Sequence, residues 1–125
     1  GAVAWAEKAK MPSSRGDKAA VTMSDGSIIV VGGETHAREQ QSQVAAHPVE
    51  QYYPEHNTWV AKASIPTARF RFGAAVVDDI VYAIGGHRVC ETDWSTYASD
   101  CAEKTLDSVE ALLDVAHPDI WVHTN

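Results

Sequence analysis

Two short stretches decide the fold: residues 27–33 read SIIVVGG and residues 80–86 read IVYAIGG. Each is a run of β-branched and apolar residues that ends on two glycines. A run of this length and composition is typical of a strand that is buried on both faces. Two residues without a Cβ end the strand, because they let the chain turn where side chains would collide. The structural glycines are Gly32, Gly33, Gly85 and Gly86.

The sequence before each stretch is also repeated. Residues 5–15 read WAEKAKMPSSR, and residues 59–69 read WVAKASIPTAR. Matching Trp, Lys, Ala, Pro and Arg residues lie 54 positions apart in the two segments. The match extends in register well beyond the strand itself, so it indicates an internal repeat.

The sequence after each glycine pair continues the repeat. A polar segment leads to a Val-Glu segment that ends on Trp, VEQYYPEHNTW at 49–59 and VEALLDVAHPDIW at 109–121. Asp25-Gly26, between two apolar runs, is a strong hairpin signal. Each period of about 50 residues thus contains four strand-like runs, which is typical of one propeller blade. The expected strands are residues 18–23, 27–31, 49–53 and 58–62 in the first period and 72–77, 81–84, 109–113 and 120–123 in the second.

This pattern resembles the kelch repeat, in which four apolar residues precede a Gly-Gly pair and a Val-Glu strand with a Tyr leads to a Trp. Tyr52 matches that Tyr in the first copy, whereas the second copy has Leu112 or Leu113 there. The resemblance implies an all-β fold with two four-stranded antiparallel blades of a kelch-type β-propeller. It also implies that the three repeat Trp residues pack between adjacent blades. These residues are Trp5, Trp59 and Trp121.

The repeat divides the chain into three parts. Residues 11–62 are expected to form blade one and residues 63–125 blade two, while residues 1–10 resemble the outer strand of a preceding, neighbouring blade. Two blades cannot close a ring, because circular propellers need about four to eight. Either the chain is a fragment of a longer repeat array that supplies further blades, or several copies assemble into one ring. The unmatched outer strand favours the longer array.

The composition limits the classes of partner. The 125 residues are 45% hydrophobic and 22% charged, as in a globular domain, and the formal net charge is −7. Such a charge disfavours nucleic acid, whose phosphates would be repelled. No apolar run approaches the roughly 20 residues of a membrane span. No phosphate-binding loop, catalytic motif or His pair with metal-ligand spacing is present, so we expect no cofactor, metal or catalytic residue.

The segment 87–106 is the longest irregular stretch, and the segment 34–48 takes the same place in the first period. The resemblance implies that such loops, together with the linkers between blades, project on one face. Long loops on a rigid scaffold are where function tends to lie. Because aromatic and Arg side chains dominate binding hot spots, we expect this face to bind a protein or a glycan. The expected binding residues are Arg69, Arg71, Arg88, Trp94 and Tyr97.

Cys90 and Cys101 are the only cysteines, and both lie in the second loop. Their even number and short separation favour a disulfide, which would stabilise by roughly 3 kcal/mol in the chain-entropy model and indicate a secreted or extracellular protein. The alternative is two reduced thiols in a cytoplasmic protein. Zinc is less favoured, because neither cysteine belongs to a CxxC pair and His87 is the only imidazole nearby.

Two segments carry Arg in a suggestive context. Residues 15–17 spell Arg-Gly-Asp, which integrins recognise, but Arg15 already matches Arg69 as a repeat position, so an adhesive role is disfavoured. Residues 69–72 read RFRF, and this alternation could offer cationic groups above aromatic rings to an acidic partner. The alternative is that the Phe side chains belong to the core and the segment has a structural role.

Two other functions stay open beside a binding module. Some kelch-like propellers act on sugars, as copper-dependent oxidases or isomerases, or on small metabolites. The copper enzymes use Tyr and His ligands, and no arrangement in this sequence matches that set. The third possibility is a structural element of a larger assembly. Fold does not fix function, so the sequence favours a binding module and leaves catalysis open.

Overall fold

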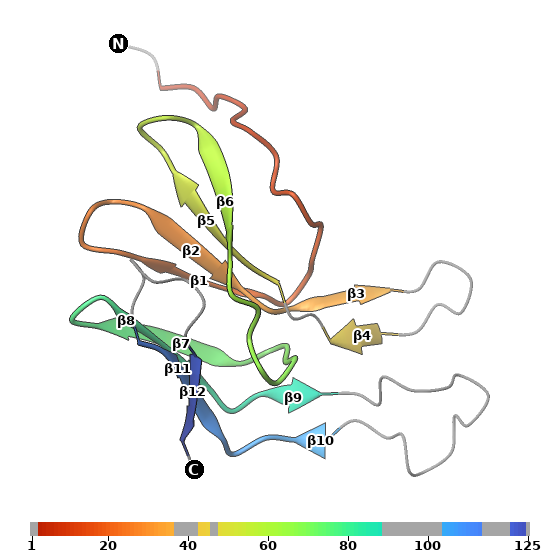
Figure 1. Cartoon of the computed structure of the whole chain (residues 1–125). Helices are drawn as coiled ribbons and strands as arrows, with labels where there is room; N and C mark the ends of the chain where they lie inside the picture. The colour runs from red at the N-terminus through yellow and green to blue at the C-terminus, as the bar shows by residue number, and fades with distance from the viewer. Residues whose placement is uncertain (1–2, 37–42, 46–47, 89–103, 114–120, 125) are drawn as a thin grey trace.

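The structure is a computed structural model that describes residues 3–36, 43–45, 48–88, 104–113 and 121–124. The fold is all-β. Two four-stranded antiparallel sheets lie one above the other, and two short two-stranded hairpins extend beside them (Figure 1). The two larger sheets correspond to the two blades that the sequence predicts.

The first sheet, which we call blade one, has the strand order β1-β2-β5-β6. Its turn between β1 and β2 follows the Asp-Gly signal. The Asp25 carboxylate accepts hydrogen bonds from the backbone N–H and the hydroxyl of Ser27, at 2.8 and 2.5 Å, and Gly26 has a φ of +88°. The strands agree with the prediction to within one residue at each end. They are β1 (Ala19–Thr22), β2 (Ile28–Val31), β5 (Val49–Tyr53) and β6 (Thr58–Lys62).

The second sheet, blade two, has the order β12-β11-β8-β7. Its first turn is Asp78-Asp79, where φ values of +52° and +61° suit a two-residue type I′ hairpin. The Asp79 carboxylate also accepts hydrogen bonds from the backbone N–H and the hydroxyl of Ser24, so the hairpin tips of the two blades are joined. The strands again agree with the prediction to within one residue. They are β7 (Gly73–Val77), β8 (Ile80–Ile84), β11 (Val109–Leu112) and β12 (Trp121–Thr124).

Two further strand pairs form where the sequence predicts irregular structure. β3 (Glu34–His36) pairs with β4 (Gln43–Ala45), and β9 (His87–Arg88) pairs with β10 (Lys104–Thr105), both antiparallel. The expectation of irregular loops is therefore wrong at the base of each loop. Strands of two or three residues are too short to give a hydrophobic period.

The main apolar core lies between the two blades. Side chains of β2 and β5 pack with side chains of β8 and β11, and the linker between the blades adds one isoleucine. Burying one such aliphatic side chain stabilises by about 1.5–3 kcal/mol, so this layer joins the blades strongly. The core residues are Met23, Ile29, Val31, Val49, Ile65, Val81, Ala83 and Leu112.

One face of blade two is open where the matching face of blade one is covered. Val31, at the end of β2, is fully buried, whereas its repeat counterpart Ile84 is 46% exposed. A Cβ on Gly32 would meet the Arg69 carbonyl oxygen at 2.7 Å, but a Cβ on Gly85 would come no closer than 3.4 Å to its nearest neighbour. Blade two supplies the cover for blade one, and in a ring a following blade would occupy the corresponding place on blade two.

The N-terminal segment lies beside blade one without forming a strand of it. Residues 3–10 pair as a strand with no part of the chain that the structure describes, and Trp5 is fully exposed. Pairing of this segment with a further blade stays a prediction. Packing of Trp5 between blades requires the preceding blade, so it also stays a prediction.

The other two repeat Trp residues lie in the outer strands β6 and β12. The Trp59 ring is half-buried, with its centroid 4.9 Å from that of Tyr52, and the indole N–H donates to the Ala9 carbonyl oxygen at 2.9 Å. Trp121 pairs with Leu112 across β12 and β11. Trp59 thus ties the outer strand to the N-terminal segment.

Candidate functional site

The loops of both blades leave the sheets at the same end. β2 and β8 each end on a Gly-Gly pair, and from there the hairpins β3–β4 and β9–β10 project in the same direction, away from the turns that join β1 to β2 and β7 to β8 (Figure 1). The linkers 11–18 and 63–72 enter the antiparallel strands β1 and β7 at this end too. We call this end of the two blades the loop face. Loops and linkers thus share one face, as the resemblance implies.

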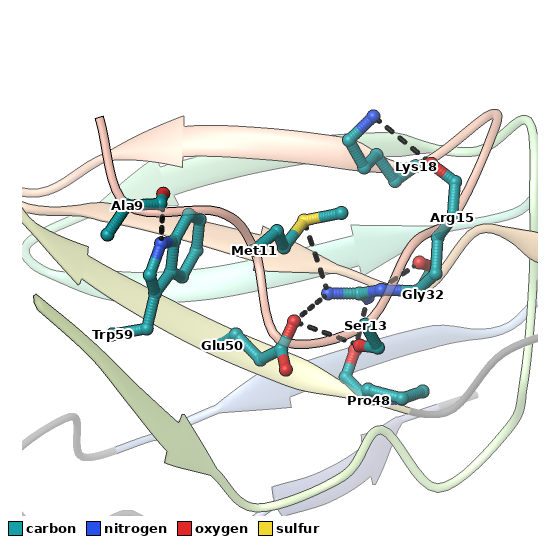
Figure 2. Close-up of polar contacts among 9 residues, drawn as sticks. All are labelled: Ala9, Met11, Ser13, Arg15, Lys18, Gly32, Pro48, Glu50 and Trp59. Atoms are coloured by element: carbon teal, nitrogen blue, oxygen red, sulfur yellow. Dashed lines mark hydrogen bonds and ion pairs between the residues drawn. The ribbon is translucent and has the colours of Figure 1, made fainter. Parts of the chain in front are cut away.

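A buried arginine holds both ends of the blade-one loop (Figure 2). Arg15, in the linker before β1, donates from Nη1 to the carbonyl oxygens of Gly32 and Pro48, each at 2.7 Å, and these two residues flank the loop between β2 and β5. Nη2 forms an ion pair with Glu50 of β5 at 2.7 Å. The Ser13 hydroxyl donates to the same carboxylate at 3.0 Å. The guanidinium therefore ties linker, loop and sheet together.

The same arrangement recurs in blade two at matching repeat positions. Arg69 donates from Nη1 to the carbonyl oxygens of Gly85 and Ser108 at 2.8 and 3.1 Å, and its Nη2 pairs with Glu110 at 2.8 Å. Thr67 donates to the Glu110 carboxylate through its backbone N–H and its hydroxyl, at 3.1 and 2.9 Å. Buried charges are tolerated when they are paired and hydrogen-bonded, and this pair meets both conditions. We call each of these two networks an arginine clamp.

The clamps overturn one prediction and remove an alternative. The sequence suggests that Arg69 binds an acidic partner, but its side chain has no exposed surface, and further blades could only cover it more. That prediction is wrong because the repeat position, and not the neighbouring Phe residues, determines where the side chain points. Arg15 is buried in the same way, so the Arg-Gly-Asp tripeptide does not present its Arg side chain to a partner.

The second glycine of each pair allows two backbones to approach closely. A Cβ on Gly33 would lie 2.5 Å from the Gly16 carbonyl oxygen, and a Cβ on Gly86 would lie 2.5 Å from the Phe72 Cβ. Gly33 also donates its N–H to the Arg69 carbonyl oxygen at 2.8 Å. The base of the blade-one loop is therefore fixed against the linker that enters blade two.

An exposed ion pair joins the two linkers on the loop face. Arg71 donates its backbone N–H to the Asp17 carbonyl oxygen at 3.0 Å and its Nε to the Asp17 carboxylate at 3.1 Å. The two side chains are 53% and 41% exposed. The Arg71 guanidinium lies 5.5 Å from the centroid of the Phe70 ring. Arg71 is thus a predicted binding residue that the structure leaves accessible.

The same contacts determine the charge state of Asp17. The hydrogen bond from Arg71 is the main cause that holds the pKa of the Asp17 carboxyl below its usual value, and a hydrogen bond with Glu34 lowers it further. A carboxyl group with a lowered pKa is ionised at neutral pH. The pair therefore exists as a true ion pair under physiological conditions.

The other predicted binding residues divide between exposed and undescribed positions. Arg88 ends β9 and is exposed. It follows His87, which exchanges two backbone hydrogen bonds of 3.0 Å with Phe70, the residue before Arg71. Arg71 and Arg88 therefore directly follow the two residues of one β-bridge, Phe70 and His87. The predicted binding residues Trp94 and Tyr97 and the predicted disulfide partners Cys90 and Cys101 lie outside the described residues, so these stay predictions.

The described ranges give no sign of a metal site or a membrane-spanning helix. Within them, no three His, Cys, Asp or Glu side chains are grouped so as to hold a metal ion. Nor does that part of the chain include a helix long and apolar enough to cross a membrane.

Sequence reasoning missed the acidic members of the site. Glu50 and Glu110 belong to the repeated Val-Glu motif, and a charged residue that recurs inside an apolar strand in both copies indicates a buried partner of opposite charge. Asp17 was considered only as the third residue of the Arg-Gly-Asp tripeptide. Asp17 lies 54 positions before Arg71, so the repeat register alone indicates that the two residues occupy matching positions.

Comparison with known proteins agrees with the repeat and with the geometry. The model of the Kelch motif matches residues 68–112. The chain belongs to the kelch-repeat family. Its kelch relatives include Kelch-like ECH-associated protein 1B of Danio rerio, 31% identical over 87 residues, and Kelch-like protein 31 of Homo sapiens, 36% identical over 87 residues. Beta-scruin of Limulus polyphemus is 36% identical over 84 residues.

The kelch chain is much shorter than these relatives. The three alignments cover 70%, 66% and 66% of the chain but 14%, 13% and 8% of the respective relatives. Among solved structures, that of YjhT is similar, with a TM-score of 0.60 and 24% identity, over 68% of the chain and 25% of YjhT. This last likeness shows the fold alone.

Proposed function

We propose that this kelch chain is part of a propeller that binds another protein through the loop face. The observation that carries the proposal is the placement of both hairpins and both linkers at one end of the blades, held there by the two arginine clamps. A scaffold that fixes its loops in advance loses less conformational entropy on binding. Arg71 and Arg88 supply exposed cationic side chains of the type that is enriched at binding hot spots.

The relatives support a protein partner in preference to a glycan. Two of them are kelch-like proteins, and one is named for its association with ECH. From these relatives we carry over to the present chain only the general role of binding a protein. The open face around Ile84 supports further blades, supplied by a longer chain, as a second kind of partner.

Loop replacement tests the proposal without disturbing the blades. The last described pairs of the two hairpins are His36–Gln43 and Arg88–Lys104. An Asn-Gly turn can close each pair in place of the intervening residues, because this dipeptide favours the type I′ hairpin. Peptides that bind the unmodified chain are selected from a random display library. Their affinities are then measured for both shortened chains and for Glu55→Ala, in the β5–β6 turn at the opposite end.

We expect selected peptides to bind at least one shortened chain about 10-fold more weakly, because hot-spot residues concentrate the binding energy. Glu55→Ala should leave the affinity unchanged. Peptides that keep their full affinity for both shortened chains would contradict the proposal. A glycan array that gives binders where the peptide library gives none would replace the protein partner by a glycan.

A further inference from the structure

We propose that Arg71 is the anion-receiving residue of the loop face. Its two Nη groups bind a carboxylate from an acidic segment of the partner protein, while Asp17 holds the Nε side of the guanidinium in place. Arg71 is the binding residue and Asp17 the positioning residue. This inference rests on the proposed function of the loop face and names the chemistry of its ligand.

The hydrogen bonds of the two neighbouring arginines show which one is available. Arg69 donates from Nε, Nη1 and Nη2 to groups inside blade two and has no exposed surface. Arg71 donates only from Nε, and neither of its Nη groups bonds to any residue that the structure describes. A guanidinium presents its N–H groups as a planar fork that matches both oxygens of a carboxylate. The Nη edge of Arg71 is therefore an exposed fork without an internal acceptor among the described residues.

Three contacts hold the Arg71 side chain in a defined position. Its backbone N–H donates a hydrogen bond to the Asp17 carbonyl oxygen, and its Nε donates one to the Asp17 carboxylate. The guanidinium lies over the Phe70 ring. Phe70 is itself fully buried and bridged to His87. Ordering a long side chain on binding costs about 0.5–1.5 kcal/mol, so a side chain that is already held binds more favourably.

The backbone of both residues indicates that their side chains are needed. Asp17 and Arg71 have φ values of +46° and +51°, in the left-handed region that glycine adopts without strain. The two residues occupy the same repeat position in consecutive linkers, 54 positions apart. The other described non-glycine residues with positive φ, Asn57, Asp78 and Asp79, lie in tight turns between strands, whereas Asp17 and Arg71 lie in the linkers. Strained positions outside turns concentrate at functional sites. The two strained positions together place the ionised carboxylate of Asp17 beside the exposed guanidinium of Arg71.

The test compares two labelled peptides, one of six Glu residues and one of six Gln residues, by fluorescence anisotropy with the full chain. The Glu peptide should bind at least about 10-fold more tightly than the Gln peptide. Arg71→Lys keeps the charge but loses the planar fork, so it should weaken binding of the Glu peptide about 10-fold. Lys10→Met, which removes an exposed charge from the N-terminal segment, is the control and should leave binding unchanged.

Two substitutions of Asp17 separate positioning from charge. Asp17→Asn removes a negative charge near the site but keeps an oxygen that can accept from Nε, so the Glu peptide should bind at least as tightly as to the unmodified chain. Asp17→Ala removes the acceptor as well, and binding should be about fivefold weaker than in Asp17→Asn. Equal affinities of these two variants would show that Asp17 does not position Arg71.

The outcomes distinguish this inference from the proposed function. Equal binding of the Glu and Gln peptides, or full affinity of Arg71→Lys, would overturn the assignment of Arg71. So would a uronate oligosaccharide that binds more tightly than the Glu peptide. None of these results would alter the effect of the shortened loops, which tests the loop face itself. Loss of selected peptides on loop replacement, with full affinity of Arg71→Lys, would place the binding energy elsewhere on the same face.

Discussion

Replacement of Arg69 by Met tests the arginine clamp directly. Met has a flexible apolar side chain that fills irregular core space but donates no hydrogen bond. The substitution leaves Glu110 without exposed surface and without its cation, and it frees the carbonyl oxygens of Gly85 and Ser108. Breaking a buried pair by removing one partner costs about 3–5 kcal/mol. We therefore expect Arg69→Met to remove a large part of the stability of the chain, which for a single domain is about 5–15 kcal/mol.

The size of the expected shift follows from the length of the chain. An unfolding entropy of about 2.1 cal/mol/K per residue gives roughly 0.26 kcal/mol/K for 125 residues. A loss of about 3–5 kcal/mol then lowers Tm by about 11–19 °C. Thermal unfolding at pH 7, followed by circular dichroism, measures this shift.

Two controls make the reasoning refutable. Arg71→Met removes an exposed pair, which is worth at most about 1 kcal/mol, so Tm should fall by less than about 4 °C. Arg69→Met combined with Glu110→Leu should recover much of the loss, because an apolar replacement of a buried pair is often neutral or stabilising. If Arg69→Met and Arg71→Met melt within about 4 °C of each other, the clamp does not hold the blade as described.

Three further predictions use repeat positions and turns. In urea unfolding, Gly32→Ala should cost more than about 2 kcal/mol, because strain adds to a clash with the next blade, whereas Gly85→Ala should cost only the strain of about 1–2 kcal/mol; equal costs would contradict the packing. Trp59→Ala should cost about 1–3 kcal/mol and Trp5→Ala less than about 0.5 kcal/mol, and a larger effect at Trp5 would show that it is buried in solution. Hydrogen bonds lower the pKa of Asp79 in the folded state, so its contribution is complete above the unfolded pKa, near 4, and is lost as pH falls through the lower folded value. Asp79→Asn should therefore flatten the acid limb of a plot of Tm against pH, and an unchanged limb would refute the assignment.

The strands of both blades could be predicted because the same sequence pattern occurs twice in the chain. Apolar runs closed by Gly-Gly, and Val-Glu segments ended by Trp, fixed eight strands to within one residue of their observed ends. Local signals sufficed there: β2 is buried and shows a continuous apolar run, whereas β1 and β7 alternate between half-buried and exposed residues and pair with β2 and β8 through tight turns. The short strands β3, β4, β9 and β10 could not be found in this way, because each has only two or three residues. Their pairing depends on the glycine turns that precede β3 and β9.

The site was predicted less well than the fold for a different reason. Arg15 and Glu50 are 35 residues apart, and Arg69 and Glu110 are 41 apart, so no local pattern connects the members of a pair. Adjacent arginines looked alike in the sequence although one is buried and the other exposed. Only the repeat register distinguished them, since position 69 has an Arg counterpart and position 71 has an Asp counterpart.

The arginine clamp also determines where the chain can be cut and rejoined. Because Arg15 lies before the first strand of its blade and bonds to Pro48 and Glu50 near the third, a segment that begins at β1 leaves its own clamp behind. Such a segment would carry an unpaired buried carboxylate into any new setting. A loop moved between propellers should therefore travel with the linker that precedes its blade, and a recombination library of this fold should place its junctions upstream of Ser13 rather than at the strand boundary.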